Sequence, residues 1–177
     1  ENMIKTINIT KKRLSEEDID RASEMILNHK RLLIIGQGSS NITAQDAFSR
    51  FIRIGIDTSI VLDSHLLYMY SSLLNKDTVV LCYTFSGETY EVIKTAKIAK
   101  ENGCPIIGVT NYASSEMTKI ADLCLFTSGY EKNIKGGFLS SKVSQLFVSD
   151  ILITRCAIGN AEKTKDYIER TTKSIIN

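Results

Sequence analysis

The chain has 177 residues, of which 43% are hydrophobic and 24% charged, proportions typical of one globular domain with a buried core. Its 22 basic residues nearly balance its 20 acidic ones, and a net charge of +2 argues against a nucleic-acid-binding surface on this chain alone. No apolar run approaches the roughly 18 residues of a membrane span, and no secretory signal pattern opens the sequence, so we expect no membrane partner.

Four cysteines are spread along the chain without a CxxC pair, and three of them lie inside apolar runs. A free thiol in such a run behaves as a small apolar side chain. This pattern argues against a disulfide or metal framework and favours a reducing cytoplasm. The four are Cys82, Cys104, Cys124 and Cys156.

The opening residues differ from the rest of the chain in their weak periodicity. Residues 1–12 predict a short strand or an arm, so residues 1–14 are expected to be an N-terminal arm or linker before one domain over residues 15–177. Helical spacing begins after Ser15, which with the acidic residues behind it resembles a capping box. The predicted helices cover residues 15–30, 41–54, 65–74, about 92–99, 114–120, 138–158 and 161–175.

Short apolar runs rich in β-branched residues alternate with these helices. Such runs are typical of strands buried on both faces of a parallel sheet. The pattern predicts an α/β fold, a three-layer αβα sandwich around a sheet of four or five parallel strands. The predicted strands cover residues 32–35, 57–62, 78–83, 105–109 and 123–126.

Two of these strands run into loops of small, hydroxyl-bearing residues just before a helix. One loop is Gly36-Gln37-Gly38-Ser39-Ser40 and the other is Thr84-Phe85-Ser86-Gly87-Glu88-Thr89. Backbone N–H groups at a helix N-terminus hold anions, glycine allows close approach, and hydroxyls donate to phosphate oxygens. Because ligands of parallel sheets bind beyond the carboxyl ends of the strands, the loops predict an anion site at that edge.

Each loop taken singly has a simpler interpretation, since serine, threonine and glycine are preferred at the start of any helix. The two loops together, after successive buried strands, favour the anion site. A dinucleotide-binding GxGxxG motif would need glycine at the position of Asn41. No GKS or GKT sequence is present, which excludes a P-loop.

The segment from Leu32 to Cys156 resembles SIS (sugar isomerase) domains. The resemblance rests on the two loops, on Gly108-Val109-Thr110-Asn111 after the next strand, and on Ser140-Ser141-Lys142 through Gln145 in the last large helix. It implies a five-stranded parallel sheet of flavodoxin-like or Rossmann-like type, normally dimeric, with ligands near the subunit boundary and with no metal or cofactor. It also implies that a phosphosugar is bound by Gly38, Ser39, Ser40, Thr84, Ser86, Gly87, Thr89, Ser140 and Ser141.

The details are most similar to one branch, the effector domains of RpiR-type bacterial transcription regulators. The similarity lies in Asp63-Ser64-His65 ahead of a helix, in residues 139–146 and in the lead-in helix. Members of this branch carry an N-terminal helix-turn-helix domain, which we expect to be absent from these residues. The resemblance implies a homodimer or higher oligomer that binds a sugar phosphate and contacts DNA only through that absent domain.

Several further side chains have two interpretations. His65 could act as a general base, although a role in lining the pocket or capping a helix is favoured. Glu88 is predicted in the first turn of a helix, where the dipole stabilises a carboxylate, beside the pocket. Asp46 is a loose match to the catalytic glutamate of SIS isomerases, so no catalytic residue is assigned. Solvated positions are more typical than phosphate contacts for Lys132, Lys135 and Lys142.

Three functions follow from these patterns. The leading one is a sugar-phosphate-sensing domain of a transcription regulator that is not an enzyme. The alternative is a stand-alone aldose–ketose isomerase, which needs a base within about 3 Å of the proton that it removes. The third is a dimerisation module whose loops bind nothing. The identity of the sugar does not follow from the sequence.

Overall fold

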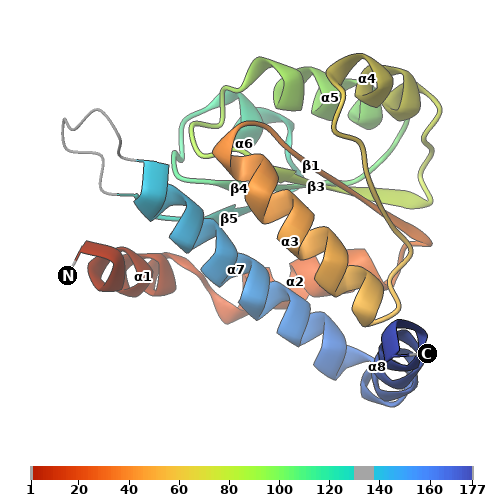
Figure 1. The fold of residues 1–177 in the computed structure, drawn as a ribbon. Helices are drawn as coiled ribbons and strands as arrows, with labels where there is room; N and C mark the ends of the chain where they lie inside the picture. Colours follow the sequence, from red (N-terminus) through yellow and green to blue (C-terminus); the bar gives the residue numbers. More distant parts are fainter. Residues whose placement is uncertain (1, 130–137, 177) are drawn as a thin grey trace.

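Five parallel strands form one sheet at the centre of the computed structural model, which describes residues 2–129 and 138–176 (Figure 1). The order across the sheet is β2-β1-β3-β4-β5, so the chain winds outwards in opposite directions on either side of the β1/β3 pair. A flavodoxin-like sheet has this order, and its ligands bind where the winding direction changes. The strands are β1 (Arg31–Gly36), β2 (Thr58–Ile60), β3 (Thr78–Tyr83), β4 (Ile106–Thr110) and β5 (Leu123–Phe126).

Helices cover both faces of the sheet and complete the three layers that the sequence predicted. One apolar core joins α2, α3 and α7 to one face, and a second joins α4, α5 and α6 to the other. Along β3, Leu81 faces the first core, whereas Val80 and Cys82 face the second, as the two-residue period of a strand requires. The helices are α1 (Asn2–Arg13), α2 (Glu16–Leu27), α3 (Ser39–Arg53), α4 (Ser64–Ser72), α5 (Tyr90–Glu101), α6 (Glu116–Ile120), α7 (Phe138–Gly159) and α8 (Ala161–Ile176).

The N-terminal segment is helix α1, and the prediction of a short strand or an arm there is wrong. Its buried face carries Thr6 and Thr10, both fully buried, whereas Ile4 is 67% exposed. The Thr10 hydroxyl donates to the Thr6 carbonyl oxygen at 2.8 Å and accepts from the backbone N–H of Ser128 at 3.0 Å. Because threonine hydroxyls rather than large apolar side chains anchor α1, its sequence lacks the apolar stripe by which an amphipathic helix is found.

The four cysteines are free thiols, and Cys82, Cys104 and Cys156 pack within the two cores. Three of them are buried and Cys124 is half-buried. Burial raises the pKa of the Cys124 thiol to about 11 and that of the Cys156 thiol to about 12. These thiols therefore stay protonated at neutral pH.

Candidate functional site

The first hydroxyl-rich loop turns the chain from β1 into α3 within three residues. Gly38 adopts a φ of +56°, a conformation that side-chain-bearing residues rarely take, and Ser39 is the first residue of the helix. Gly36 lies so close to the first turn that a Cβ there would stand 2.7 Å from the Ser40 carbonyl oxygen. Both glycines are therefore required by the tight turn, which brings backbone N–H groups to the carboxyl edge of the sheet.

The second loop, residues 84–89, leads from β3 into α5 and is held together by its own hydroxyls. Thr84 Oγ1 accepts from the backbone N–H of Gly87 at 3.2 Å and lies 3.2 Å from Thr89 Oγ1. Ser86 Oγ accepts from the backbone N–H of Glu88 at 3.1 Å, and the Ser86 side chain is exposed. Gly87, with a φ of +72°, makes the reversal. The loop is thus preorganised, with one serine facing solvent.

The sheet register places the two loops next to each other. Gly36 and Tyr83, the last residues of β1 and β3, are aligned partners in neighbouring strands. Adjacent strands lie about 4.8 Å apart, so the chain enters both loops from the same level of the sheet. The place where they meet is also the point at which the winding direction of the sheet changes.

The two helices that follow these loops, α3 and α5, differ from α2, α4 and α6 in how their N-termini are capped. α2, α4 and α6 begin with side-chain caps from Ser15, Asp63 and Ser115. The N-cap of α3 is Gly38 and that of α5 is Thr89, and neither helix has a side-chain cap hydrogen bond. The simpler interpretation, in which the loop hydroxyls cap their own helices, therefore fails for α3 and α5. At α3 the N–H groups of Ser40 and Asn41 donate to the carbonyl oxygens of Gln37 and Gly38 instead, at 3.1 and 3.2 Å. The positive ends of both helix dipoles still point to the carboxyl edge of the sheet.

A buried polar network lies below the first loop and was not predicted. Ser40, 5% exposed, accepts a hydrogen bond of 3.0 Å from the side-chain amide of Gln145 on α7. Ser149, one turn further along α7, donates to the Gln145 carbonyl oxygen at 2.9 Å and lies 2.7 Å from the hydroxyl of Tyr83. Burial raises the pKa of Tyr83, so its hydroxyl stays neutral. The only signal in the sequence was the presence of Gln145 in the family motif.

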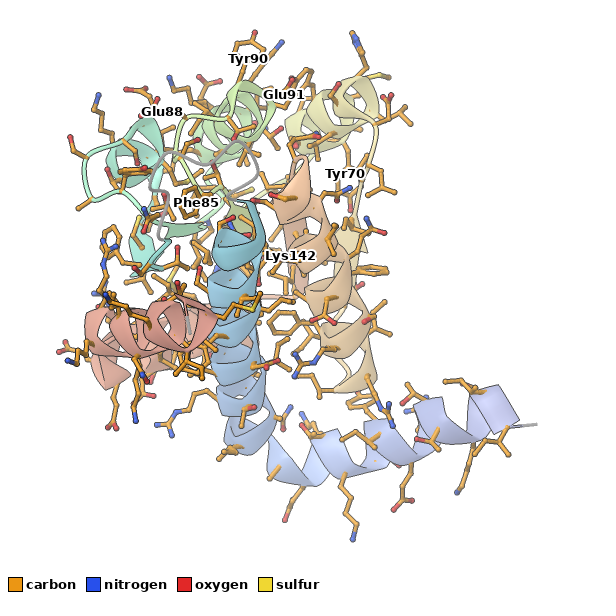
Figure 2. The ribbon with its side chains drawn as sticks, turned by 60° about the vertical axis from the view of Figure 1, so that its left-hand side comes forward. Tyr70, Phe85, Glu88, Tyr90, Glu91 and Lys142 are labelled. Atoms are coloured by element: carbon orange, nitrogen blue, oxygen red, sulfur yellow. The ribbon has the colours of Figure 1, made fainter. Side chains whose placement is uncertain are left out.

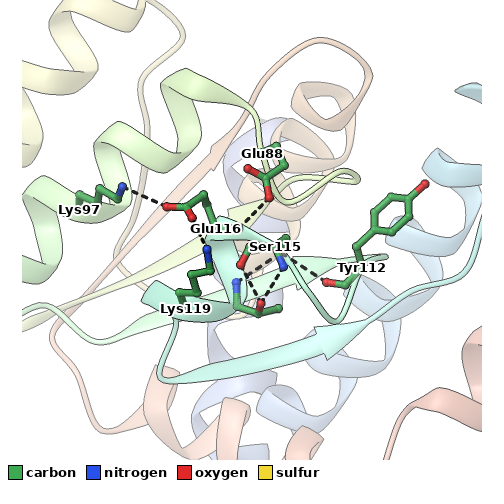
Figure 3. A network of polar contacts seen from close by, with 7 residues as sticks. Glu88, Lys97, Tyr112, Ser115, Glu116 and Lys119 are labelled. Carbon is green, nitrogen blue, oxygen red and sulfur yellow. Dashed lines mark hydrogen bonds and ion pairs between the residues drawn. The ribbon is translucent and has the colours of Figure 1, made fainter.

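Glu88 was predicted in the first turn of the helix that follows it, and this prediction is wrong. It precedes Thr89, the N-cap of α5. Its carboxylate accepts a hydrogen bond of 2.8 Å from the backbone N–H of Glu116, the first residue of α6 (Figure 3). Hydrogen bonds from Lys119 at 2.6 Å and Lys97 at 3.2 Å lower the pKa of Glu116. Glu88 thus acts at a helix N-terminus, but at that of α6, and ties the second loop to it.

His65 is exposed near the start of α4, and the predicted capping role is wrong, because Asp63 Oδ1 accepts from the backbone N–H of Leu66 at 2.8 Å. Its ring lies 6.4 Å from that of Tyr68 in an edge-on arrangement. Among the described residues it has no hydrogen-bonding partner that would orient it as a base. Asp46 lies 3.5 Å from the guanidinium of Arg50 in an ion pair.

The serines of α7 are only partly described. Ser141 is 2% exposed, and its carbonyl oxygen accepts from the Ser144 hydroxyl at 2.8 Å. Figure 2 shows Lys142 on the first turns of α7, toward the end of the molecule where Phe85 and Glu88 lie. The side chain of Ser140, with Lys132 and Lys135, lies outside the described residues.

Two grooves on the described surface lie away from these loops. One of about 660 Å³ runs between α1, α2 and α7, and another of about 460 Å³ runs between α7 and α8. Within residues 2–129 and 138–176, no helix is long and apolar enough to cross a membrane, and no group of three His, Cys, Asp or Glu side chains is placed to hold a metal ion. The case for a ligand therefore depends on loop chemistry.

Comparison with known proteins points to one family and one kind of relative. The SIS domain family model matches residues 25–155. An uncharacterised HTH-type transcriptional regulator of Clostridium perfringens is 37% identical over 175 residues, covering 97% of this chain and 63% of that protein. The Escherichia coli HTH-type transcriptional regulator RpiR is 30% identical over 174 residues, covering 94% of this chain and 59% of that protein. The chain thus spans about three fifths of the length of these relatives.

Solved structures share the fold over nearly the whole chain. The Vibrio vulnificus NanR protein, complexed with ManNAc-6P, is 26% identical and superposes with a TM-score of 0.92, covering 99% of this chain and 66% of that one. The sugar isomerase domain of an RpiR transcription factor from Sphaerobacter thermophilus is 20% identical, with a TM-score of 0.89 over 97% of this chain and 94% of that one. The latter likeness concerns the fold alone.

Proposed function

Because the chain belongs to the SIS domain family, we propose that it is the phosphosugar-sensing domain of an RpiR-type transcription regulator. The observation that carries the proposal is the pair of hydroxyl-lined loops at the aligned ends of β1 and β3, each opening a helix without a side-chain cap. The dipoles of α3 and α5 favour a phosphate there, and the hydroxyls of Ser39, Ser86 and Thr89 would supply donors. Gly38, Ser40, Thr84, Gly87, Ser140 and Ser141 complete the proposed site.

DNA binding belongs, in this proposal, to a helix-turn-helix domain outside these residues. The relatives named HTH-type regulators extend well beyond the part that this chain matches. The net charge of +2 gives this chain little attraction for DNA of its own. As part of a transcription regulator, the domain would act in the cytoplasm.

The proposed role is sensing rather than catalysis. An aldose–ketose isomerase needs a positioned base. His65 is exposed and has no orienting partner among the described residues, while Asp46 is paired with Arg50. These features favour a binding site. An isomerase assay with the phosphosugar that binds should show no turnover above background, and measurable turnover would replace this proposal with the isomerase.

The proposal includes a homodimer or higher oligomer, supported by an apolar stripe along α4. Large apolar side chains on α4 and directly beside its two ends are 56–82% exposed. A contiguous exposed patch of this kind marks an interaction surface, and a second copy of the chain can cover it by symmetric helix packing. The stripe consists of Leu66 and Met69 on α4, with Leu62 just before the helix and Leu73 at its C-cap.

The oligomer is tested by sedimentation velocity of the wild type and of Leu66→Glu/Met69→Glu. The double variant should sediment as a monomer, because two carboxylates cannot be buried across the seam. Ile175→Glu, at an exposed position on α8, is the control and should leave the oligomer intact. A monomeric wild type would reject the oligomer, and an unchanged double variant would reject this surface.

Phosphosugar binding is tested by thermal shift and calorimetry with ManNAc-6P and with panels of pentose and hexose phosphates, since a ligand of the folded state raises the melting temperature. Ser86→Ala/Thr89→Ala should weaken binding at least about 100-fold, because two hydrogen bonds to a charged group are lost and each is worth about 1.5–3 kcal/mol. The matched control is Ser72→Ala/Ser174→Ala, which removes two exposed hydroxyls that bond only to their own helices. Equal affinity in the two double variants would contradict the site.

A further inference from the structure

Arg13, at the end of α1, reaches the loops that follow two strands of the sheet. Its guanidinium donates to Asn111 Oδ1 at 3.2 Å and to the Thr127 carbonyl oxygen at 2.5 Å, and it lies 5.4 Å from the centre of the Phe126 ring. These contacts join residues about a hundred positions apart. They also stand at the carboxyl edge of the sheet, because Asn111 follows β4 and Thr127 follows β5.

From Asn111, one further hydrogen bond leads to the proposed phosphate loop. The backbone N–H of Asn111 donates to the Phe85 carbonyl oxygen at 3.0 Å. The Thr110 hydroxyl donates to the same oxygen at 3.3 Å. Phe85 directly precedes Ser86, so its peptide group sets where the serine stands. The path from α1 to the phosphate loop therefore consists of two hydrogen bonds through one asparagine.

A second attachment holds α1 to the same edge, and its hydrogen bonding is incomplete. Thr10 accepts from the backbone N–H of Ser128, beside the bond from the Thr127 N–H to the Thr110 carbonyl oxygen. Within the described residues the buried hydroxyls of Thr6 and Thr127 have no hydrogen-bond partner. Unpaired buried hydroxyls cost stability, so this polar attachment at the end of β5 holds α1, which also packs on α7, less firmly than a fully paired one would.

We propose that Arg13 is a positioning residue that couples the docking of α1 to occupancy of the phosphate loop. A bound phosphosugar would hold residues 84–89, and through the Phe85 carbonyl would hold Asn111 in the position that accepts from Arg13. By reciprocity, release of α1 would weaken ligand binding by the same factor. The inference rests on the proposed function. It adds a coupling between the phosphosugar site and α1, the helix that would follow the proposed DNA-binding domain.

The coupling is tested by hydrogen–deuterium exchange of the 177-residue chain with and without the phosphosugar that binds best, using ManNAc-6P first. Ligand should slow exchange of the α1 amides severalfold in the wild type. Arg13→Ala should abolish that slowing and weaken ligand binding about three- to tenfold. Lys12→Ala, which removes a neighbouring exposed charge, should change neither.

Two further variants separate positioning from general stability. Asn111→Asp keeps an acceptor for Arg13 and should retain the ligand effect on α1, whereas Asn111→Leu should lose it as Arg13→Ala does. If Arg13→Ala unfolds the chain, Arg13→Lys with Thr10→Val replaces it, since together they weaken both attachments. The coupling alone would be overturned if the wild type binds ligand, Ser86→Ala/Thr89→Ala does not, and the ligand leaves hydrogen exchange of α1 in the wild type unchanged. Absence of any ligand binding would overturn the proposed function instead.

Discussion

The side-chain amide of Gln145 donates to Ser40 Oγ at 3.0 Å and so joins α7 to the first turn of α3. Thr43 donates to the other end of the same amide at 3.5 Å, which orients it. Because Ser40 accepts from Gln145, its own hydroxyl hydrogen remains to be donated elsewhere. The buried amide thus leaves the hydroxyl hydrogen of Ser40 available, as the proposed phosphate site requires.

Gln145→Met is predicted to weaken phosphosugar binding about tenfold and to lower the free energy of unfolding by about 1–2 kcal/mol. Methionine is similar in size to glutamine but leaves the buried hydroxyls of Ser40 and Thr43 without their partner. Calorimetric titration and urea denaturation measure the two effects. Gln45→Met, at an exposed position on α3, is the control and should change neither. Tight binding by Gln145→Met would show that the amide does not orient Ser40.

The pair of Tyr83 and Ser149 is predicted to be energetically coupled. Ser149→Ala leaves the buried Tyr83 hydroxyl without its partner at 2.7 Å and should cost about 1–3 kcal/mol. Tyr83→Phe should cost less, since Ser149 keeps its bond to the Gln145 carbonyl oxygen. Adding Tyr83→Phe to Ser149→Ala should lower the free energy of unfolding by about 1 kcal/mol less than Tyr83→Phe does in the wild type. Additive losses of unfolding free energy would argue against the pair.

Gly87→Ala is predicted to destabilise the fold more than Gly103→Ala does. Both glycines have a strongly positive φ, of +72° and +79°. A Cβ at position 87 would overlap the Ser115 side chain, whereas one at 103 has its nearest neighbour at 3.9 Å. The strain common to both is about 1 kcal/mol, and steric overlap should add about 1–3 kcal/mol at position 87. Equal melting temperatures for the two variants would contradict this packing of the second loop on Ser115.

Alkaline pH is predicted to destabilise the fold partly through Cys124. Burial raises the pKa of this thiol from 9.0 to about 11, so between these values the unfolded chain loses the proton first. The stability that this group contributes is complete below pH 9 and is lost as the pH rises through about 11. Cys124→Ala should therefore show a shallower fall in unfolding free energy from pH 9 to 11, measured by urea denaturation. Parallel pH profiles for variant and wild type would exclude this contribution.

The sheet and most of its helices could be predicted from the sequence alone, because burial along a single element leaves a local period. The run from Thr78 to Tyr83 is apolar because β3 is buried on both faces, and α5 shows its apolar side at helical spacing. The small hydroxyl residues before α3 and α5 likewise mark the loops as soon as the strands are assigned. These features depend on neighbours only a few positions away.

Tertiary structure alone decided which polar groups meet. Ser40 and Gln145 are 105 positions apart, Arg13 and Asn111 are 98 apart, and Glu88 acts on a helix 28 residues further along the chain. A hydrogen bond depends on the position and direction of two groups to within a fraction of an ångström, and no local pattern records a partner so distant. For the same reason α1, which is anchored by Thr10 rather than by an apolar stripe, could be identified as a helix only from the tertiary structure.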